Sequence, residues 1–199
     1  MSTSGEVQHT LSAQVEDLVR QNEEVLQAVT GQCRSLSTDQ LSWRPLPGTW
    51  SVGQILSHLT LTDQLYRPGM MGAVGAARSK GLRSTGPFKL GLMLGLFTRL
   101  LEPPVRFRMK APRPFRPPPP AEEVKPGTLD DFVVEHGRII ELMRGAGGVD
   151  LASERFASPY TSLLKLTVYQ ALHIITSHAR RHIWQIKRMI DDPSFPHVN

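Results

Sequence analysis

Apolar side chains recur at every third or fourth position in four stretches of the chain, which is the spacing of amphipathic helices. The first stretch covers about residues 6–31, and the second covers Ser51 to Tyr66. The third begins at Thr128 in "TLDDFVVEHGRIIELMRG", and the last extends from about Ser162 to Ile190. Strand signals are weak throughout the sequence. Two short connections and one long one join these helices, so the pattern predicts an all-α four-helix bundle.

Residues that commonly cap helices flank two of these stretches. Gln54 follows Ser51 at the third position, which is the arrangement of a capping box at a helix N-terminus. Thr128 is expected to cap the third helix, and Gly145 to follow its last turn. These signals support the helix starts independently of the apolar periodicity.

The long connection lies between the second and third helices and covers residues 67–127. Gly and Pro are frequent there, and "RPFRPPPP" predicts an extended, polyproline-like chain. Only residues 90–101 have the pattern of a short helix. We expect a single domain over residues 1–199, with 67–127 as the crossover and 191–199 as a tail.

The net charge of +5 is concentrated in this connection. The segment from Arg78 to Arg116 holds ten Lys or Arg residues and one acid, Glu102, for a net charge of +9. The rest of the chain has 13 basic and 17 acidic residues, for a net charge of −4. The basic character therefore belongs to one segment and not to the whole protein.

The cysteine content and the hydropathy of the sequence indicate where in the cell the protein is located. Cys33 is the single cysteine, so an internal disulfide is excluded. No run reaches the roughly 18 apolar residues of a membrane span. The start "MSTSGEVQHT" lacks the basic and apolar regions of a signal peptide. We expect a cytoplasmic protein without a membrane partner.

Two histidines lie four positions apart in "HARRHIWQIKRM", inside the last predicted helix. At about 100° per residue, His178 and His182 fall at the centre of the apolar stripe, whereas His173 falls about 140° away from His178. Imidazoles at i and i+4 point the same way and can share one metal ion. The alternative is a pair of core histidines that hydrogen-bond to nearby hydroxyl groups.

A metal site needs at least one more ligand, and two histidines compete for this role. His58 lies at the edge of the apolar stripe of the second helix. His136 lies on the third helix, where its polar neighbour Glu135 argues for a more exposed position. The spacing of His178 and His182 lacks the glutamate of the metalloprotease motif, because Ala179 occupies that position.

Three stretches of the chain resemble the DinB-like superfamily of bacterial metal-binding four-helix bundles. They are "RPLPGTWSVGQILSHL", "MKAPRPF" and "SPYTSLLKLTVYQALHIITSHARRHIWQIKRM". The resemblance implies a three-histidine metal site formed by His58, His178 and His182, with zinc or nickel as the ion. It also implies that Gln185 supports the ligands or packs beside them, and that Trp50 docks its loop onto the bundle.

The resemblance implies two chemistries and one non-catalytic role. The first chemistry is metal-dependent transfer of a low-molecular-weight thiol, and the second is hydrolysis of a small ester or amide. The third possibility is a bundle that only binds metal or a partner, and a homodimer is expected. No catalytic base is identified: Asp63 is predicted to point away, and Tyr66 and Cys33 are interpreted as core or incidental residues.

The basic segment allows one further class of partner. Arg106, Arg108, Lys110, Arg113 and Arg116 alternate with apolar residues, a composition that can bind nucleic acid or an anionic surface. Prolines prevent a recognition helix here, which disfavours nucleic acid. The same alternation fits an extended segment that covers the metal site with its apolar side inward, so that the arginines receive the carboxylates of an anionic thiol.

Overall fold

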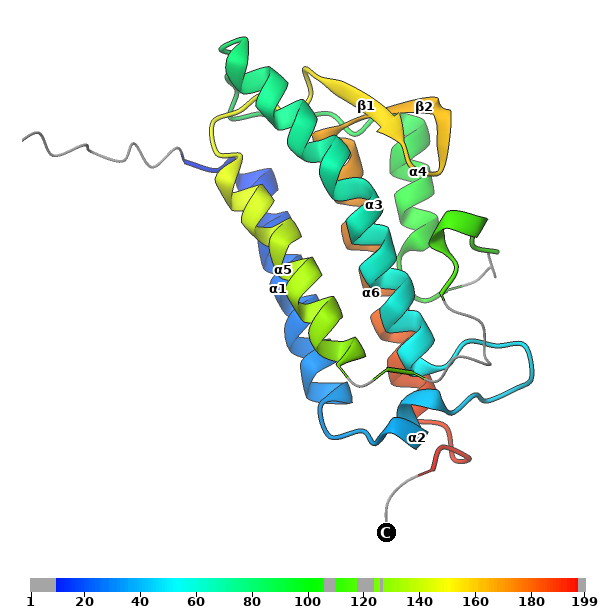
Figure 1. Cartoon of the computed structure of the whole chain (residues 1–199). Coiled ribbons are helices and arrows are strands. Elements are labelled where there is room, and N and C mark those ends of the chain that lie inside the picture. Colours follow the sequence, from blue (N-terminus) through cyan, green and yellow to red (C-terminus); the bar gives the residue numbers. More distant parts are fainter. Residues whose placement is uncertain (1–9, 106–109, 118–123, 126, 197–199) are drawn as a thin grey trace, which may run out of the picture.

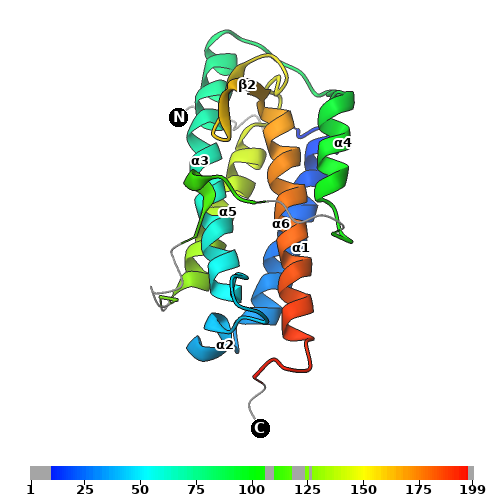
Figure 2. The ribbon, with the colours of Figure 1, turned by 90° about the vertical axis from the view of Figure 1, so that its right-hand side faces the viewer.

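The computed structural model describes residues 10–105, 110–117, 124–125 and 127–196. In this part of the chain, four long helices lie side by side: α1 (Ala13–Cys33), α3 (Val52–Ser79), α5 (Thr128–Gly145) and α6 (Val168–Ile190). Helix α3 packs against α5 and α6, and α1 packs against the same two helices. The protein is thus mostly helical, with its long helices aligned along one axis (Figures 1 and 2).

Helix α3 begins where its sequence signals place it but ends later than expected. Ser51 accepts a hydrogen bond from the backbone N–H of Gln54, and the Gln54 side chain returns to the Ser51 backbone. The predicted end at Tyr66 is wrong, because the helix continues through Pro68 to Ser79. The apolar spacing explains this, since a further set of buried residues extends the inner face of α3: Met70, Ala73, Val74 and Ala77.

The start of α5 also differs by one residue from the prediction. Gly127, at φ 89°, precedes the helix, so Thr128 is its first residue and not its cap. The Thr128 hydroxyl donates to the carbonyl of Lys125 instead. Gly145 is the last residue of α5, not the residue after it.

A small two-stranded sheet replaces the expected first turns of the last helix. Strands β1 (Arg155–Ser158) and β2 (Thr161–Thr167) pair antiparallel, and α6 begins only at Val168. Thr167 caps α6 with a capping box that involves Gln170. The predicted start at Ser162 is therefore wrong: Leu163 and Leu164 are exposed strand residues rather than part of a helical stripe.

The connection from α3 to α5 contains further short elements. Helix α4 (Leu92–Leu101) packs on α6, and the 3-10 turn η1 (Arg113–Phe115) packs on α3. Helix α2 (Thr38–Ser42) lies between α1 and α3 in the chain and packs on α3. Because the helix expected to end at Tyr66 extends to Ser79, the connection begins at Lys80 and not at residue 67.

Two clusters of buried apolar residues fill the space between the long helices. One is centred near Phe132, Leu56 and Ile186, and the other near Met143, Leu172 and Ile139. No helix in the described ranges has the length and apolar content needed to cross a membrane. The core therefore holds α3 and α6 in contact along the length that carries the histidines.

Candidate metal centre

Helices α3 and α6 bring three histidines together from distant parts of the sequence. His178 and His182 lie one turn apart on the same face of α6, and His58 faces them from α3. The His178 Nε2 atom is 3.0 Å from Nε2 of His58 and 3.1 Å from Nε2 of His182. The three donor atoms all lie within 4.8 Å of one another, near enough to hold one metal ion.

The three rings differ in their exposure to solvent. His58 and His182 are buried, at 4% and 7% exposure, whereas His178 is only partly buried. Among the described residues, no other group of three His, Cys, Asp or Glu side chains converges in this way, and no carboxylate joins the cluster. His178 is therefore the most exposed of the three residues.

Hydrogen bonds on the far side of two rings fix which nitrogen faces the cluster. His58 Nδ1 lies 2.5 Å from the carbonyl oxygen of Phe115, and His182 Nδ1 lies 3.0 Å from Oε1 of Gln185. A carbonyl oxygen only accepts, so these Nδ1 atoms carry the protons. In the neutral rings, Nε2 then presents a lone pair to the cluster, which is the tautomer that metal-ligating histidines adopt.

The surroundings keep these imidazoles neutral. Burial lowers the pKa of all three rings, and for His178 and His182 the neighbouring histidines and Arg181 lower it further. The Phe115 carbonyl opposes this effect at His58, as the Gln185 side chain does at His182. Lone pairs about 3 Å apart repel one another unless a cation lies between them, so the donor set fits a divalent ion.

Trp50 forms an aromatic wall beside the cluster. Its ring centroid lies 4.8 Å from that of His58 and 6.3 Å from that of His182. Sequence reasoning placed Trp50 in the core as the residue that docks its loop. The structure confirms that Trp50 packs against the core, and it also places the ring beside two of the three candidate ligands.

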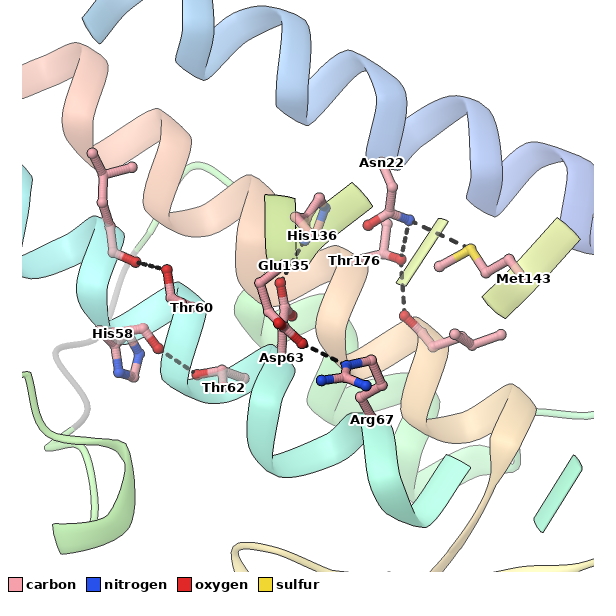
Figure 3. A network of polar contacts seen from close by, with 12 residues as sticks. Asn22, His58, Thr60, Thr62, Asp63, Arg67, Glu135, His136, Met143 and Thr176 are labelled. Atoms are coloured by element: carbon pink, nitrogen blue, oxygen red, sulfur yellow. Dashed lines mark hydrogen bonds and ion pairs between the residues drawn. The ribbon is translucent and has the colours of Figure 1, made fainter. Parts of the chain in front are cut away.

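His136, the rival candidate for the third ligand, belongs to a different group. Its Nδ1 atom lies 2.7 Å from Oδ2 of Asp63, and both side chains are almost fully buried. Burial raises the pKa of the Asp63 carboxyl, and the neighbouring His136 counteracts this. In Figure 3 the pair lies apart from the His58 ring.

The expected exposure of His136 is wrong, and its polar neighbour Glu135 is buried as well. His136 has no exposed surface, and Glu135 is 2% exposed. The Glu135 carboxylate is compensated by two arginines: Arg67 Nε lies 2.6 Å from it, and Arg138 Nη1 lies 2.8 Å from it. These pairings explain how a polar stretch of α5 faces inward, and they leave His58 as the residue that joins the α6 pair.

Neither of the other titratable candidates faces the cluster. The Tyr66 side chain is buried and hydrogen-bonds to Ser158, and burial raises its pKa. Cys33 is buried at the end of α1, and burial raises the pKa of its thiol to about 12. Both residues are therefore core residues, as the sequence interpretation held.

The crossover reaches the site through its backbone. Phe115 is buried, and its neighbours Arg113 and Arg116 are exposed, which is the predicted arrangement of apolar side inward and arginines outward. Arg106 and Arg108 lie outside the described residues. Sequence reasoning missed the hydrogen bond between His58 and Phe115, because a backbone carbonyl carries no side-chain signature.

Comparison with known proteins gives one match. The model of the DinB superfamily matches residues 18–186, which is most of the chain and includes all three histidines. No curated protein and no solved structure gives a match.

Proposed function

The chain belongs to the DinB superfamily, and we propose that it holds one divalent metal ion at His58, His178 and His182 in a four-helix bundle. The observation that carries this proposal is the convergence of the Nε2 atoms of three histidines. Two of these donors have tautomers set by hydrogen bonds on the opposite nitrogen. Zinc and nickel are the ions that such a nitrogen donor set suits best.

Three protein ligands leave room for a further ligand on the metal. A set of three donors with an open position is typical of catalytic sites, whereas structural zinc sites are closed by four. The partial exposure of His178 gives a small molecule access to that position. Trp50 and the buried residues His58 and His182 line the rest of the cluster.

We propose further that the protein transfers a low-molecular-weight thiol to an electrophile. A bound divalent ion supplies Lewis acidity that stabilises a thiolate near neutral pH. The thiol proton leaves to solvent, the sulfur forms a bond to the electrophilic carbon, and the group that this carbon loses departs with its bonding electrons. The histidines hold the site, and the basic side chains of the crossover at Lys110, Arg113 and Arg116 attract an anionic thiol.

Hydrolysis of a small ester or amide is the second candidate function. Hydrolysis commonly uses a general base beside the metal. Asp63 is engaged by His136, Tyr66 by Ser158, and Cys33 is buried as a thiol. Thiol transfer needs no side chain that acts as a base, because the thiol loses its single proton to solvent. We therefore rank thiol transfer ahead of hydrolysis. A protein that only binds metal is the third candidate.

Elemental analysis tests the metal site directly. Tag-free protein purified without added metal, then soaked in zinc or nickel and desalted, is expected to hold about one ion per chain. His58→Ala, and the double variant His178→Ala with His182→Ala, should each lose the ion. His173→Ala is the matched control, because this histidine is on α6 but outside the cluster. Retention of metal by His58→Ala would show that the third ligand is wrongly assigned.

Turnover assays separate the three candidates. A panel of small thiols is mixed with a chromogenic aryl halide, and a nitrophenyl ester is tested in parallel, each with metal-loaded and metal-free protein. Thiol conjugation that needs both the metal and His178 supports the transferase. Ester cleavage alone supports the hydrolase, and metal-linked stability without turnover supports the binding role. Light scattering on the same sample measures whether the protein is the proposed homodimer.

A further inference from the structure

Helix α4 has a second apolar face, on its outside, that no part of the described structure covers. Leu92 is 93% exposed and Met93 is 87% exposed. Leu96, at 61%, and Leu100, at 47%, continue the same surface one and two turns later. Large aliphatic side chains exposed singly are ordinary, but a contiguous set on one helix face marks an interaction site.

The spacing of these residues separates the outer face from the packed one. At about 100° per residue, the four exposed side chains occupy an arc of about 100°. On the opposite side, Thr98 and Leu101 are buried, and α4 contacts α6. The helix therefore uses one apolar face for the fold and leaves another outside it.

Basic side chains flank the outer face of α4. Arg99 lies at the edge of the exposed arc and Lys89 precedes the helix; both are exposed, and neither forms an ion pair with a described residue. The one acid between Arg78 and Arg116 is Glu102, and its carboxylate lies 3.1 Å from the Arg180 guanidinium. The surface around α4 is thus apolar at its centre and positive at its rim.

The hairpin of β1 and β2 adds similar side chains at the same end of the molecule. Leu163 is 93% exposed and Tyr160 is 60% exposed, and the neighbouring Lys165 is also exposed. Figures 1 and 2 both show the first turn of α4 and this hairpin at one end of the long helices. Exposed apolar groups beside lysine therefore gather at this end.

We infer that the outer face of α4, assisted by the hairpin, docks onto the surface of an anionic lipid bilayer, which revises the expectation from the sequence of no membrane partner. An apolar face rimmed by Lys and Arg is the pattern of helices that lie in the membrane interface. A helix of 10 residues is about 15 Å long, too short to span, so α4 lies parallel to the surface. Its leucines enter the headgroup region, and Lys89 and Arg99 contact the lipid phosphates.

Charge distinguishes this partner from the alternatives. In a symmetric dimer, each copy presents the same surface, so pairing through α4 brings Lys89 and Arg99 of one copy near those of its partner. Nucleic acid neutralises the basic rim but leaves Leu92, Met93 and Leu96 exposed to water. An anionic bilayer covers the apolar residues and neutralises the rim together.

Vesicle flotation of the full chain tests the inference. The protein is mixed with vesicles of phosphatidylcholine alone, or of equal parts phosphatidylglycerol and phosphatidylcholine, at low and at high salt. Binding is expected to the anionic vesicles and to be about tenfold or more weaker to neutral vesicles or at high salt. Equal binding to neutral and anionic vesicles would overturn the proposed role of the basic residues. No binding to either kind of vesicle would overturn the inference as a whole.

Variants on exposed positions test the surface itself. Leu92→Glu with Leu96→Glu should abolish flotation, and Lys89→Ala with Arg99→Ala should weaken it. Val134→Glu on α5 is the control, because Val134 is an apolar residue exposed on another helix, at 54% against 61% for Leu96. Circular dichroism and metal content should be unchanged in all variants. Flotation that persists in Leu92→Glu with Leu96→Glu would overturn lipid docking. It would also be overturned if the wild-type protein did not bind vesicles and formed a dimer that this double variant dissociates.

Discussion

The Nδ1 atom of His58 lies 2.5 Å from the carbonyl oxygen of Phe115, a residue 57 positions further along the chain. One bond thus joins a candidate metal ligand on α3 to the crossover. The bond holds His58 in the tautomer that presents Nε2 to the cluster. The buried ring of Phe115, whose centroid is 6.3 Å from that of Tyr66, anchors the crossover where it makes this bond.

Removing this anchor should weaken metal binding. We expect Phe115→Ala to raise the Kd for zinc about tenfold, because without the buried ring the backbone carbonyl of residue 115 is no longer held against His58, and loss of a hydrogen-bond partner behind a ligand typically has an effect of this size. A competition titration against a chromophoric zinc chelator measures it. Phe88→Ala is the matched control, since Phe88 is equally buried and pairs with Tyr169. Equal Kd values for the two variants would show that Phe115 stabilises the fold only.

Trp50 should report on metal binding by fluorescence. Its ring is in contact with those of His58 and His182, so nickel at the cluster is expected to quench its emission. Trp50→Phe should remove most of the nickel-dependent change, and Trp43→Phe, which removes a tryptophan paired with Phe195, should preserve it. The measurement is emission against nickel concentration. A full response in Trp50→Phe would place the ion elsewhere.

The buried pair of Asp63 and His136 should stabilise the fold without affecting the metal. Breaking a buried, hydrogen-bonded pair leaves one polar group uncompensated, and we expect Asp63→Ala to lower the free energy of unfolding by about 3 kcal/mol. Urea denaturation of metal-free protein measures this loss. Metal content should remain at the wild-type value, and its loss would show that the pair contributes to the cluster.

Cys33 should be inert in the folded protein and should make stability depend on pH in the alkaline range. Burial raises its pKa from 9.0 to about 12, so the folded state holds the thiol proton more tightly than the unfolded state. This contribution is complete below about pH 9 and is lost as the pH rises through about 12. Iodoacetamide at pH 8 should label Cys33 slowly in buffer and rapidly in urea. Equal labelling rates in the two solvents would contradict its burial.

The α6 pair could be predicted from sequence because helical geometry is local. Once α6 is assigned, the spacing of His178 and His182 places both rings on one face. His58 required the family resemblance, since His136 fits the same pattern of residue types. The burial of His136 could not be foreseen, because it depends on Asp63, which is 73 positions away.

The β-hairpin was misread for a similar reason. The apolar spacing in "TSLLKLT" is compatible with a helix as well as a strand, because it places leucines at positions 163, 164 and 166. Periodicity alone therefore predicts that α6 begins within the residues that form β2. Pairing with β1 across the turn decides otherwise, and only Leu166 of the three is buried. The later end of α3 was misjudged because the frequent Gly and Pro residues after Tyr66 assigned this stretch to the connection, although its buried positions keep the helical period.

The three histidines come from segments that are 120 positions apart, because His58 precedes His178 by that distance. During synthesis, His58 therefore emerges from the ribosome long before His178 and His182. The emerging chain cannot bring all three histidines together until α6 has been synthesised and has docked against α3. A chain that ends before His182 lacks at least one of the three candidate ligands. If the proposed function holds, metal binding is in this sense a late event in the biosynthesis of the domain.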